Sequence, residues 1–469
     1  MSFESKEYCL ADMCDDVSYG YTASADEKCI GPKFLRITDI QGGVCNWSTV
    51  PYCYIDTKNK NKYKLASGDI VIARTGNSTG ENYIIQDDVD SVFASYLIRY
   101  RIDKKIADPY FVWLNLRTDK WWRFVNGAKT GSAQAGANAK VLGSYTLSLP
   151  SLAIQLGISE LFKTINKKIL GNEKLNQTLE QMAQALFKSW FVDFEPVKAK
   201  MAVLEAGGSQ EDATLAAMTA ISGKDADALL VFECEHPEKY AELKATAELF
   251  PSAIQESELG NIPEGWNIGK FGDILEFNPK RVLKKGNVAS YLDMKNVPVV
   301  GHSAQEIIDR EFNSGSKFIN GDTLLARITP CLENGKTAYV DFLPSDEIVG
   351  WGSTEFIVMR SKKNLPLSLS YFFARLDSFR TIAIQSMQGT SGRQRADASV
   401  LEQHVWAVPP NEVLQKFGTF SDLILDGNRS RSTENKSLAQ LRDTLLPKLL
   451  SGEITLPEAE QAVSEVENV

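Results

Sequence analysis

The hydrophobic and polar positions divide the chain into globular stretches and long helices. Through the first 150 residues, short β-rich runs such as 33–37, 70–73 and 93–98 alternate with turns rich in Gly, Asn and Asp. Asp108-Pro109 is typical of a helix start, because proline is favoured in the first turn. Residues 1–150 are therefore predicted to form a mixed α/β head.

A helical period replaces this pattern from residue 152. Apolar residues then recur in two runs with steps of three and four, which is the spacing of a coiled coil. The first run is Ile158, Leu161, Ile165 and Ile169, and the second is Leu175, Leu179, Met182, Leu186 and Trp190. Asn172 falls in this seam, where a polar residue can fix the register of two helices. Such a stripe alone fits a core helix as well as a helix that pairs with another.

The pattern returns roughly 260 residues later. Gly68–Thr75 recurs as Gly321–Ile328, and residues 130–134 recur as 390–394. A second helix is predicted over 412–450, with seam residues Phe417, Phe420, Ile424, Leu438, Leu441, Leu445 and Leu449. Two apolar stripes at one offset favour a helix pair. We expect the pair to be antiparallel, and because each helix follows its own head, that pairing would push the heads to opposite ends.

An acidic segment separates the two copies. Residues 198–262 hold 12 Asp or Glu against 5 Lys, so the rest of the chain is close to neutral although the total net charge is −9. Local basic surfaces, and hence nucleic-acid binding, are therefore not excluded. Short helices are predicted around Asp212–Ile221 and Pro237–Leu249, and the segment fits either a solvated linker or a docking surface.

The predicted fold class is α+β, with two α/β domains alternating with two long helices that pair as an antiparallel coiled coil in a pseudo-twofold internal repeat. The predicted boundaries are a first head at 1–150, a long helix at 151–197, an acidic helical connector at 198–262, a second head at 263–410, a second long helix at 411–454 and a C-terminal tail at 455–469.

Neither cysteines nor histidines indicate a site. The seven cysteines contain no CxxC pair, which favours reduced thiols over a zinc site, and the three histidines are scattered. We therefore expect no metal site and no catalytic residue. The chain has no run of about 18 apolar residues and begins with polar residues, so a cytoplasmic protein without a membrane span is expected.

Several segments carry a family resemblance. Leu186-Phe187-Lys188-Ser189-Trp190-Phe191-Val192-Asp193-Phe194-Glu195-Pro196-Val197 resembles the central conserved region of Type I restriction-modification specificity subunits. Residues 438–454 resemble their distal conserved region, and residues 258–266 resemble the entry to their second target-recognition domain. The Gly-Asp…Ala-Arg segment of each head also fits, so the resemblance covers nearly the whole chain.

The resemblance implies a division of labour. Each head would read one half of a bipartite site in double-stranded DNA, while the helices set the spacing and dock two modification (methyltransferase) subunits. That assembly would be an adenine-N6 DNA methyltransferase, and restriction subunits would convert it into an ATP-dependent endonuclease that translocates DNA. S-adenosylmethionine, ATP and Mg would belong to those partners, with no cofactor in this chain.

The residues themselves carry no enzyme motif. We find no Asn/Asp-Pro-Pro-aromatic methyltransferase motif, no GxxxxGK[ST] phosphate loop and no convincing Asp…Glu-x-Lys nuclease cluster. Two alternatives remain open. One is a self-contained enzyme with a divergent site, and the other is a stand-alone sequence-specific DNA-binding scaffold without a modification partner.

Candidate DNA contacts follow from side-chain chemistry. Arg bonds guanine, Asn and Gln bond adenine, and Ser, Thr and Lys mostly hold phosphates. In the first head the candidates are Arg74, Thr75, Asn77, Ser78, Lys129, Thr130, Ser132 and Gln134. In the second they are Arg327, Thr329, Lys336, Thr390, Ser391, Arg393, Gln394 and Arg395. The alternative for Arg74 and Arg327 is a structural ion pair at a strand end, while Trp121 and Trp122 are predicted to be core residues.

Overall fold

A computed structural model describes residues 5–128, 137–389 and 394–467. The chain forms two compact units, Met1–Leu170 with Glu434–Val469, and Gly171–Thr433. Each unit contains one head and a part of both long helices, α5 (Leu152–Phe191) and α14 (Asn411–Ser451).

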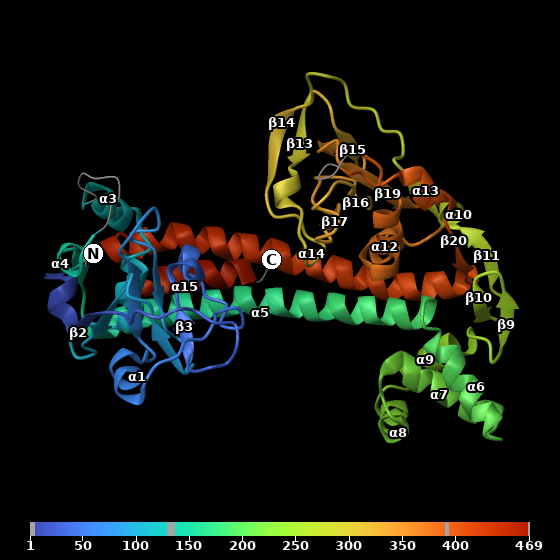
Figure 1. Ribbon diagram of the computed structural model, residues 1–469, viewed down its shortest axis with the longest axis horizontal. Coiled ribbons are helices and arrows are strands. Elements are labelled where there is room, and N and C mark those ends of the chain that lie inside the picture. The colour runs from blue at the N-terminus through green and yellow to red at the C-terminus, as the bar shows by residue number, and fades with distance from the viewer. Residues whose placement is uncertain (1–4, 129–136, 390–393, 468–469) are drawn as a thin grey trace. The chain divides into compact units, whose positions relative to one another are not determined.

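The first head is built on a four-stranded antiparallel sheet (Figure 1). Its strands follow the order β2 (Cys14–Tyr19), β7 (Leu97–Ile102), β4 (Asp69–Ala73) and β5 (Asn82–Ile84). The other elements of this head are β1 (Lys6–Cys9), β3 (Lys33–Leu35), β6 (Ser91–Phe93), β8 (Thr146–Leu149), α1 (Thr57–Tyr63), α2 (Pro109–Asn115), α3 (Asp119–Ala128), α4 (Ala139–Gly143), and the 3-10 turns η1 (Leu10–Met13), η2 (Ile37–Asp39) and η3 (Gln41–Gly43). Strands β1 and β8 pair antiparallel, and β3 and β6 pair parallel.

The core of the first unit joins the head to both long helices. Ile70, Tyr100 and Trp121 of the head share one buried cluster with Ile158 of α5 and Leu445 of α14. Trp121 is a core residue, as predicted, and its indole donates to the Gly80 carbonyl at 2.9 Å. The segment expected as a C-terminal tail contains a further helix, α15 (Leu456–Glu467), which adds buried Ala459 and Val463 to the same cluster.

The second head repeats this plan. Its four-stranded sheet has the order β12 (Leu275–Phe277), β19 (Phe356–Ser361), β16 (Thr323–Ala326) and β17 (Thr337–Tyr339). The other elements are β9 (Ile254–Ser257), β10 (Gly260–Pro263), β11 (Asn267–Lys270), β13 (Val288–Leu292), β14 (Ile307–Glu311), β15 (Ser316–Phe318), β18 (Gly350–Gly352), β20 (Val405–Val408), η4 (Met294–Asn296), α10 (Phe271–Ile274), α11 (Leu369–Arg375), α12 (Asp377–Gln385) and α13 (Ala398–Gln403).

The two sheets correspond strand by strand. The repeated Gly-Asp segments lead into β4 and β16, and each of these strands lies between the corresponding neighbours β7 and β5, or β19 and β17. Beside them, β1 pairs with β8 as β11 pairs with β20, and the parallel pair β3–β6 matches β13–β18. The internal repeat predicted from the sequence is therefore confirmed.

The long helices pair antiparallel. In the first unit, the Asn166 side chain of α5 accepts from Arg442 of α14 at 3.0 Å. In the second unit, Asn176 of α5 donates to the Asn428 carbonyl of α14 at 3.2 Å, and the Phe187 and Phe417 rings lie 5.0 Å apart. Contacts therefore move backwards along α14 as they move forwards along α5, as the predicted fold class requires.

The prediction of the seam was wrong in its middle. Leu175 and Met182, placed in the seam from their apolar character, are 45% and 56% exposed. The buried positions of this part of α5 are Asn172, Glu180 and Ala183. The buried face therefore continues through polar residues, while two large apolar residues face outward.

A network of buried charged residues ties α5 to the second head. Glu180 of α5 accepts from Tyr371 of α11 and contacts His302 Nδ1 at 3.2 Å. His302 Nε2 lies 3.3 Å from Asp341, and the Arg375 guanidinium donates to Tyr371 Oη at 2.9 Å. Arg375 also donates to the carbonyls of Val299, Gly301, Gly335 and Thr337, so this network crosslinks several loops of the head.

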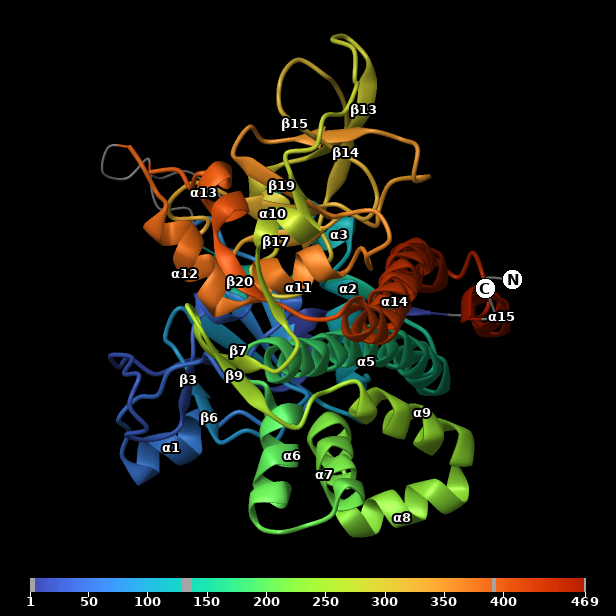
Figure 2. The same ribbon diagram turned by 90° about the vertical axis from the view of Figure 1, so that its right-hand side faces the viewer.

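The acidic connector folds as a small group of helices (Figure 2). Phe194 has a left-handed backbone (φ 54°) between the end of α5 and the start of the next helix, so the long helix ends earlier than the predicted boundary at 197. The helices are α6 (Glu195–Glu205), α7 (Gln210–Ser222), α8 (Ala226–Glu235) and α9 (Pro237–Glu248). Ala217, Met218, Leu229 and Ala247 form their buried cluster.

Within the described residues, no helix is both long enough and apolar enough to cross a membrane. The seven cysteines carry free thiols, and no group of three or more potential metal ligands occurs among the described residues.

Candidate nucleic-acid interface

The repeated Gly-Asp segments fix the start of the strands that lead to the candidate loops. Gly68 and Gly321 have φ values of 95° and 84°, a backbone region that favours glycine. Asp69 and Asp322, which follow them, are buried, and each accepts from the backbone N–H three residues earlier at 2.9 Å. Each carboxylate also pairs with an arginine of the neighbouring strand. The segment is therefore structural, and it sets the register that places Arg74 or Arg327 at the far strand end.

In the first head, Arg74 lies half-buried at the end of β4. Its guanidinium lies 4.8 Å from the centre of the Tyr19 ring, within the range of a cation–π contact. Arg74 takes part in no ion pair with another described residue, so the structural ion-pair alternative has no partner there. The Tyr19 ring instead orients a charge that stays available.

The loop after Arg74 presents polar side chains. Thr75 and Asn77 are exposed, and Ser78 accepts from Gln41 Nε2 at 3.3 Å. Gly76 and Gly80 have positive φ values of 69° and 96°, which let the loop turn tightly. The four candidates Arg74, Thr75, Asn77 and Ser78 therefore lie together in the loop that follows the end of β4.

The other candidates of the first head, Lys129, Thr130, Ser132 and Gln134, lie outside the described residues. The next described residue, Ala137, donates its N–H to the Arg74 carbonyl at 3.0 Å. The chain thus returns to the end of β4 directly after that segment.

The second head repeats this return. The Arg327 carbonyl accepts from the Ala396 N–H at 2.8 Å, and the Thr329 N–H donates to the Gln394 carbonyl at 3.1 Å. Arg327, Thr329 and Gln394 are therefore brought together, each half-buried. Thr329 precedes Pro330 through a cis peptide bond. The candidates Thr390, Ser391 and Arg393 lie outside the described residues.

Two basic candidates of the second head already have protein partners. Arg395 forms a two-pronged ion pair with Glu355 at 2.7–3.0 Å, and this hydrogen bonding holds the pKa of Glu355 below its usual value. The Lys336 ammonium donates to the carbonyls of Met294 and Lys295 at 2.8 and 3.4 Å. Lys336 therefore holds a turn of the head, whereas the 44% exposed Arg395 side chain remains accessible.

Sequence reasoning missed the residues that position these candidates. Tyr19 lies at the end of β2 and Glu355 just before β19, far in sequence from Arg74 and Arg395. No local spacing links a ring or a carboxylate to an arginine 40 or more positions away. The strand orders β2-β7-β4 and β12-β19-β16, had they been known, would have suggested both Tyr19 and Glu355.

Comparisons with known proteins place the chain. Residues 4–181 match a family described as Type I restriction modification DNA specificity domain. The specificity subunit of the Type I restriction enzyme HindI of Haemophilus influenzae is 27% identical over 96% of this chain and 99% of its own length. The EcoEI specificity subunit of Escherichia coli is 30% identical over 40% of this chain and 33% of its own length.

A solved structure agrees in fold. The S subunit of a Type I restriction-modification system from M. genitalium superposes with a TM-score of 0.52 at 13% identity, over 95% of this chain and 96% of that one. The likeness to this structure shows that the fold is shared. Residues 4–181 carry the Type I restriction modification DNA specificity domain, and the full-length relative makes the chain similar throughout to the specificity subunits of Type I restriction-modification systems, the non-catalytic component that gives such a complex its DNA specificity.

Proposed function

We propose that each head reads one half of a bipartite site in double-stranded DNA, chiefly from the major groove. The supporting observation is that both heads place an arginine at one strand end, beside a tight polar loop and a segment that returns to it. Arginine and amide side chains discriminate base edges, whereas serine, threonine and backbone amides hold phosphates. One such arginine and polar loop on each of two similar heads suits a target with two separate half-sites.

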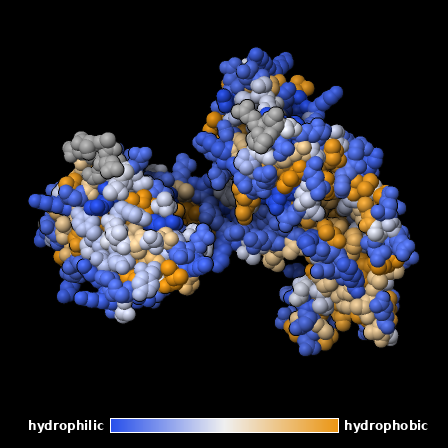
Figure 3. Space-filling model, viewed as in Figure 1, coloured by the Kyte–Doolittle hydropathy of each residue, from blue (hydrophilic) through white to orange (hydrophobic). Residues whose placement is uncertain are grey.

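The helix pair then sets the distance between the half-sites and docks the modification subunits. Its outward face supports docking, because Leu175 and Met182 of α5 and Leu423 of α14 are large apolar residues that are 45%, 56% and 70% exposed. Leu175 and Met182 are seven residues apart and so lie on one face of α5, and apolar residues gathered on one face offer a contact surface for a partner protein. Figure 3 shows that hydrophilic residues cover most of the visible face, with apolar residues in small groups.

The chemistry belongs to the partners in this proposal. Two modification subunits bind S-adenosylmethionine and transfer its methyl group to adenine N6, and restriction subunits use ATP and Mg for translocation and cleavage. The chain itself contributes recognition and geometry. We place this work in the cytoplasm, where host DNA is accessible.

Methylome sequencing of the native host and of a strain lacking this gene tests the proposal. We expect N6-methyladenine to disappear at one gapped, two-part motif and to return when the gene is restored. Restoring the gene with Arg74→Ala should disturb one half of the motif, and restoring it with Arg327→Ala should disturb the other.

A methylome that is unchanged by deletion, with specific DNA binding by the isolated chain and no complex with a methyltransferase, would contradict the proposal. That combination would identify a stand-alone DNA-binding scaffold. Methyl transfer by the chain alone would instead identify a self-contained enzyme.

A further inference from the structure

The second head concentrates positive charge at one end of its sheet. Two arginines share the buried carboxylate of Asp322. Arg360 donates to it at 2.7 Å, and Arg281 donates at 3.3 Å. Desolvation of this carboxyl raises the pKa of Asp322 despite both arginines. Asp322 can neutralise only one of the two guanidinium charges, and among the described residues the excess is met only by Glu276, an exposed carboxylate opposite Arg360 on β12.

The first head does not have this excess. Arg101 pairs with Asp69 through two bonds of 2.7 Å, and Arg99 pairs with Asp16 at 2.7 Å. Each arginine there has its own carboxylate. The surplus is therefore a property of the second head and not of the shared fold.

Arg281 is weakly held by the protein. The two hydrogen bonds that its guanidinium donates are long, 3.3 Å to Asp322 and 3.4 Å to the carbonyl of Lys280. Its side chain is only 16% exposed, and its buried Nε has no hydrogen-bond partner among the described residues. A buried guanidinium normally satisfies its N–H groups, so Arg281 retains capacity for an added acceptor.

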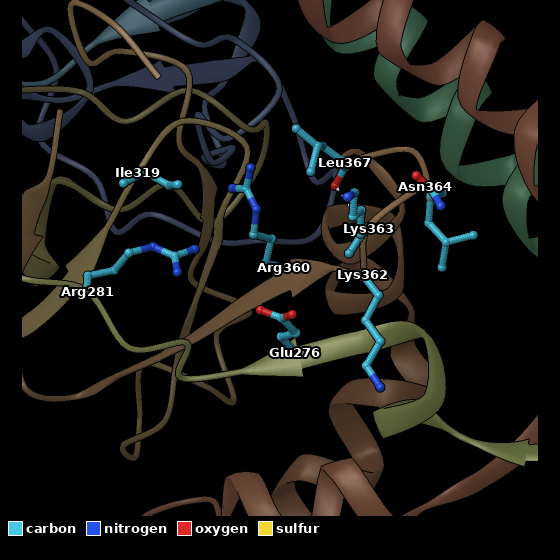
Figure 4. A pocket seen from close by; sticks show the side chains of 10 residues that line it. Glu276, Arg281, Ile319, Arg360, Lys362, Lys363, Asn364 and Leu367 are labelled. Atoms are coloured by element: carbon cyan, nitrogen blue, oxygen red, sulfur yellow. Dashed lines mark hydrogen bonds between the residues drawn. The ribbon is translucent and has the colours of Figure 1, made fainter. Parts of the chain in front are cut away.

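These groups line a cavity of about 370 Å³. Arg281 and Arg360 extend toward the same region, with the Glu276 carboxylate nearby on β12 (Figure 4). Lys362 and Lys363, directly after β19, complete the wall. Four cationic side chains thus stand against two carboxylates, Asp322 and Glu276.

The cavity lies at the opposite end of the sheet from the candidate reading loop. Strand β19 starts at Phe356, which pairs with Ala326 beside Arg327, and ends at Ser361, in the cavity wall. At about 3.3 Å per residue, the strand separates the two ends by roughly 16 Å. The cationic cavity is therefore distinct from the surface proposed to read DNA.

We propose that this cavity is a binding site for the phosphate group of a small phosphorylated molecule. The paired guanidinium groups offer several N–H donors to phosphate oxygens, and Lys362 adds charge. Glu276 on the wall disfavours a densely charged polyphosphate and favours a single phosphate. The site is independent of the function proposed above.

Inorganic phosphate is the probe, applied to the full chain. Phosphate should raise the midpoint of thermal unfolding in a saturable way, relative to chloride at equal ionic strength, and should bind measurably by calorimetry. Arg281→Gln should weaken binding by about tenfold or more, because it removes a charge-assisted hydrogen bond. Lys362→Gln should weaken binding less, but measurably, because the Lys362 side chain extends away from the two guanidinium groups and contributes charge only (Figure 4). Lys104→Gln is the matched control, since Lys104 follows the corresponding strand of the first head and should leave binding unchanged.

Three results with these small anions would overturn the site, and a fourth comes from competition with DNA. One is the absence of saturable phosphate binding, and another is equal weakening by Lys104→Gln, which would indicate total charge alone. The third is equal binding of acetate, which would point to a protein carboxylate as occupant. If Arg281→Gln does not fold, Lys362→Gln decides, because that side chain lies at the surface. Displacement of phosphate by short duplex DNA, with the same sensitivity to Lys362→Gln, would assign the cavity to DNA and also reject the proposal.

Discussion

Among single residues, His302 is held in an unusual state by its neighbours. Burial, the largest single influence, lowers the pKa of His302, but hydrogen bonds and charge from Asp341 and Glu180 outweigh it and raise the pKa to about 9, from an ordinary value of 6.5. A shift of this size corresponds to on the order of 3 kcal/mol. Protonated His302 therefore stabilises the second unit.

The sign of this effect predicts a pH dependence. Because the folded pKa is raised, the stabilisation is fully present below about pH 6.5 and is lost as the pH rises through about 9. The lowered pKa of Glu180 acts only at acid pH and does not vary in this window. Thermal unfolding of the full chain should show a midpoint that falls between pH 7 and 9.5.

His302→Gln should flatten that dependence and lower the midpoint at pH 7. The matched control is His236→Gln, because His236 is exposed at the end of α8. An equally steep fall with pH in His302→Gln would refute the assignment.

Arg74 and Arg327 allow a second prediction. Replacing either by alanine should lower specific binding or methylation by about tenfold to a hundredfold, since a good arginine–base contact contributes about 1–3 kcal/mol of discrimination. The loss should fall on one half-site for Arg74→Ala and on the other for Arg327→Ala. Binding to duplexes with single half-site changes measures this.

Arg429→Ala, an exposed residue of α14, provides the control and should leave both half-sites unaffected. A uniform loss across all sequences from Arg74→Ala would instead mean that the arginine contacts phosphate. The candidate arginines could be predicted because the repeated Gly-Asp…Ala-Arg segment marks both. The side chains that hold the candidates could not be predicted, because Tyr19 reaches Arg74, and Glu355 reaches the candidate Arg395, only through the tertiary arrangement of the strands.

For the helices, the joint between α5, α14 and the second head is a cluster of aromatic rings. Phe187 lies 4.9 Å from Phe373, 5.0 Å from Phe417 and 4.8 Å from Phe191, measured between ring centres. Trp190 adds a contact with Phe250 at 5.1 Å. The segment 186–197 that carries the family resemblance is thus a packing element.

Phe187→Ala should destabilise the second unit by about 3–5 kcal/mol, because it removes a fully buried ring and leaves a cavity. Denaturant unfolding measures the change. Met182→Ala, five residues earlier on the outward face, is the control and should cost less than about 1 kcal/mol. Similar losses in both variants would contradict the packing role of Phe187, because Met182 is 56% exposed.

The helices were predictable because their apolar steps repeat, but the seam was predictable only in part. Reading apolar residues alone selected Leu175 and Met182, whereas the chain buries Asn172 and directs Asn176 toward α14. Such polar residues are tolerated inside because Arg431 and Asn428 satisfy Asn176. Helix α15 was missed because its buried face rests on little more than Ala459 and Val463, too few apolar positions for a periodic signal.

In the whole molecule, the internal repeat explains most of the architecture, and the differences between the two copies show which features the repeat does not explain. Both heads share strand order and strand-end arginine, which follows from two copies of one sequence pattern. The connector helices belong to the second unit alone. The Glu180 network is also found only there, because the residue of α14 that corresponds to Glu180 is Ala439. Features that occur in only one of the two units cannot be predicted by comparing the two copies of the repeat.

The spacing role of the helix pair gives the last prediction. Seven residues inserted into both α5 and α14 at the boundary between the units keep the seam in phase and lengthen each helix by about 10 Å. Since one DNA turn of about 10 base pairs spans 34–36 Å, the preferred gap should grow by about three base pairs while both half-sites stay the same. Methylome sequencing of the variant measures both quantities. Insertion into α5 alone mismatches the pair and should abolish methylation. Altered half-sites at an unchanged gap would show that the helices do not set the spacing. A helix pair with that role changes only the distance between the heads and leaves the residues that read the DNA unchanged.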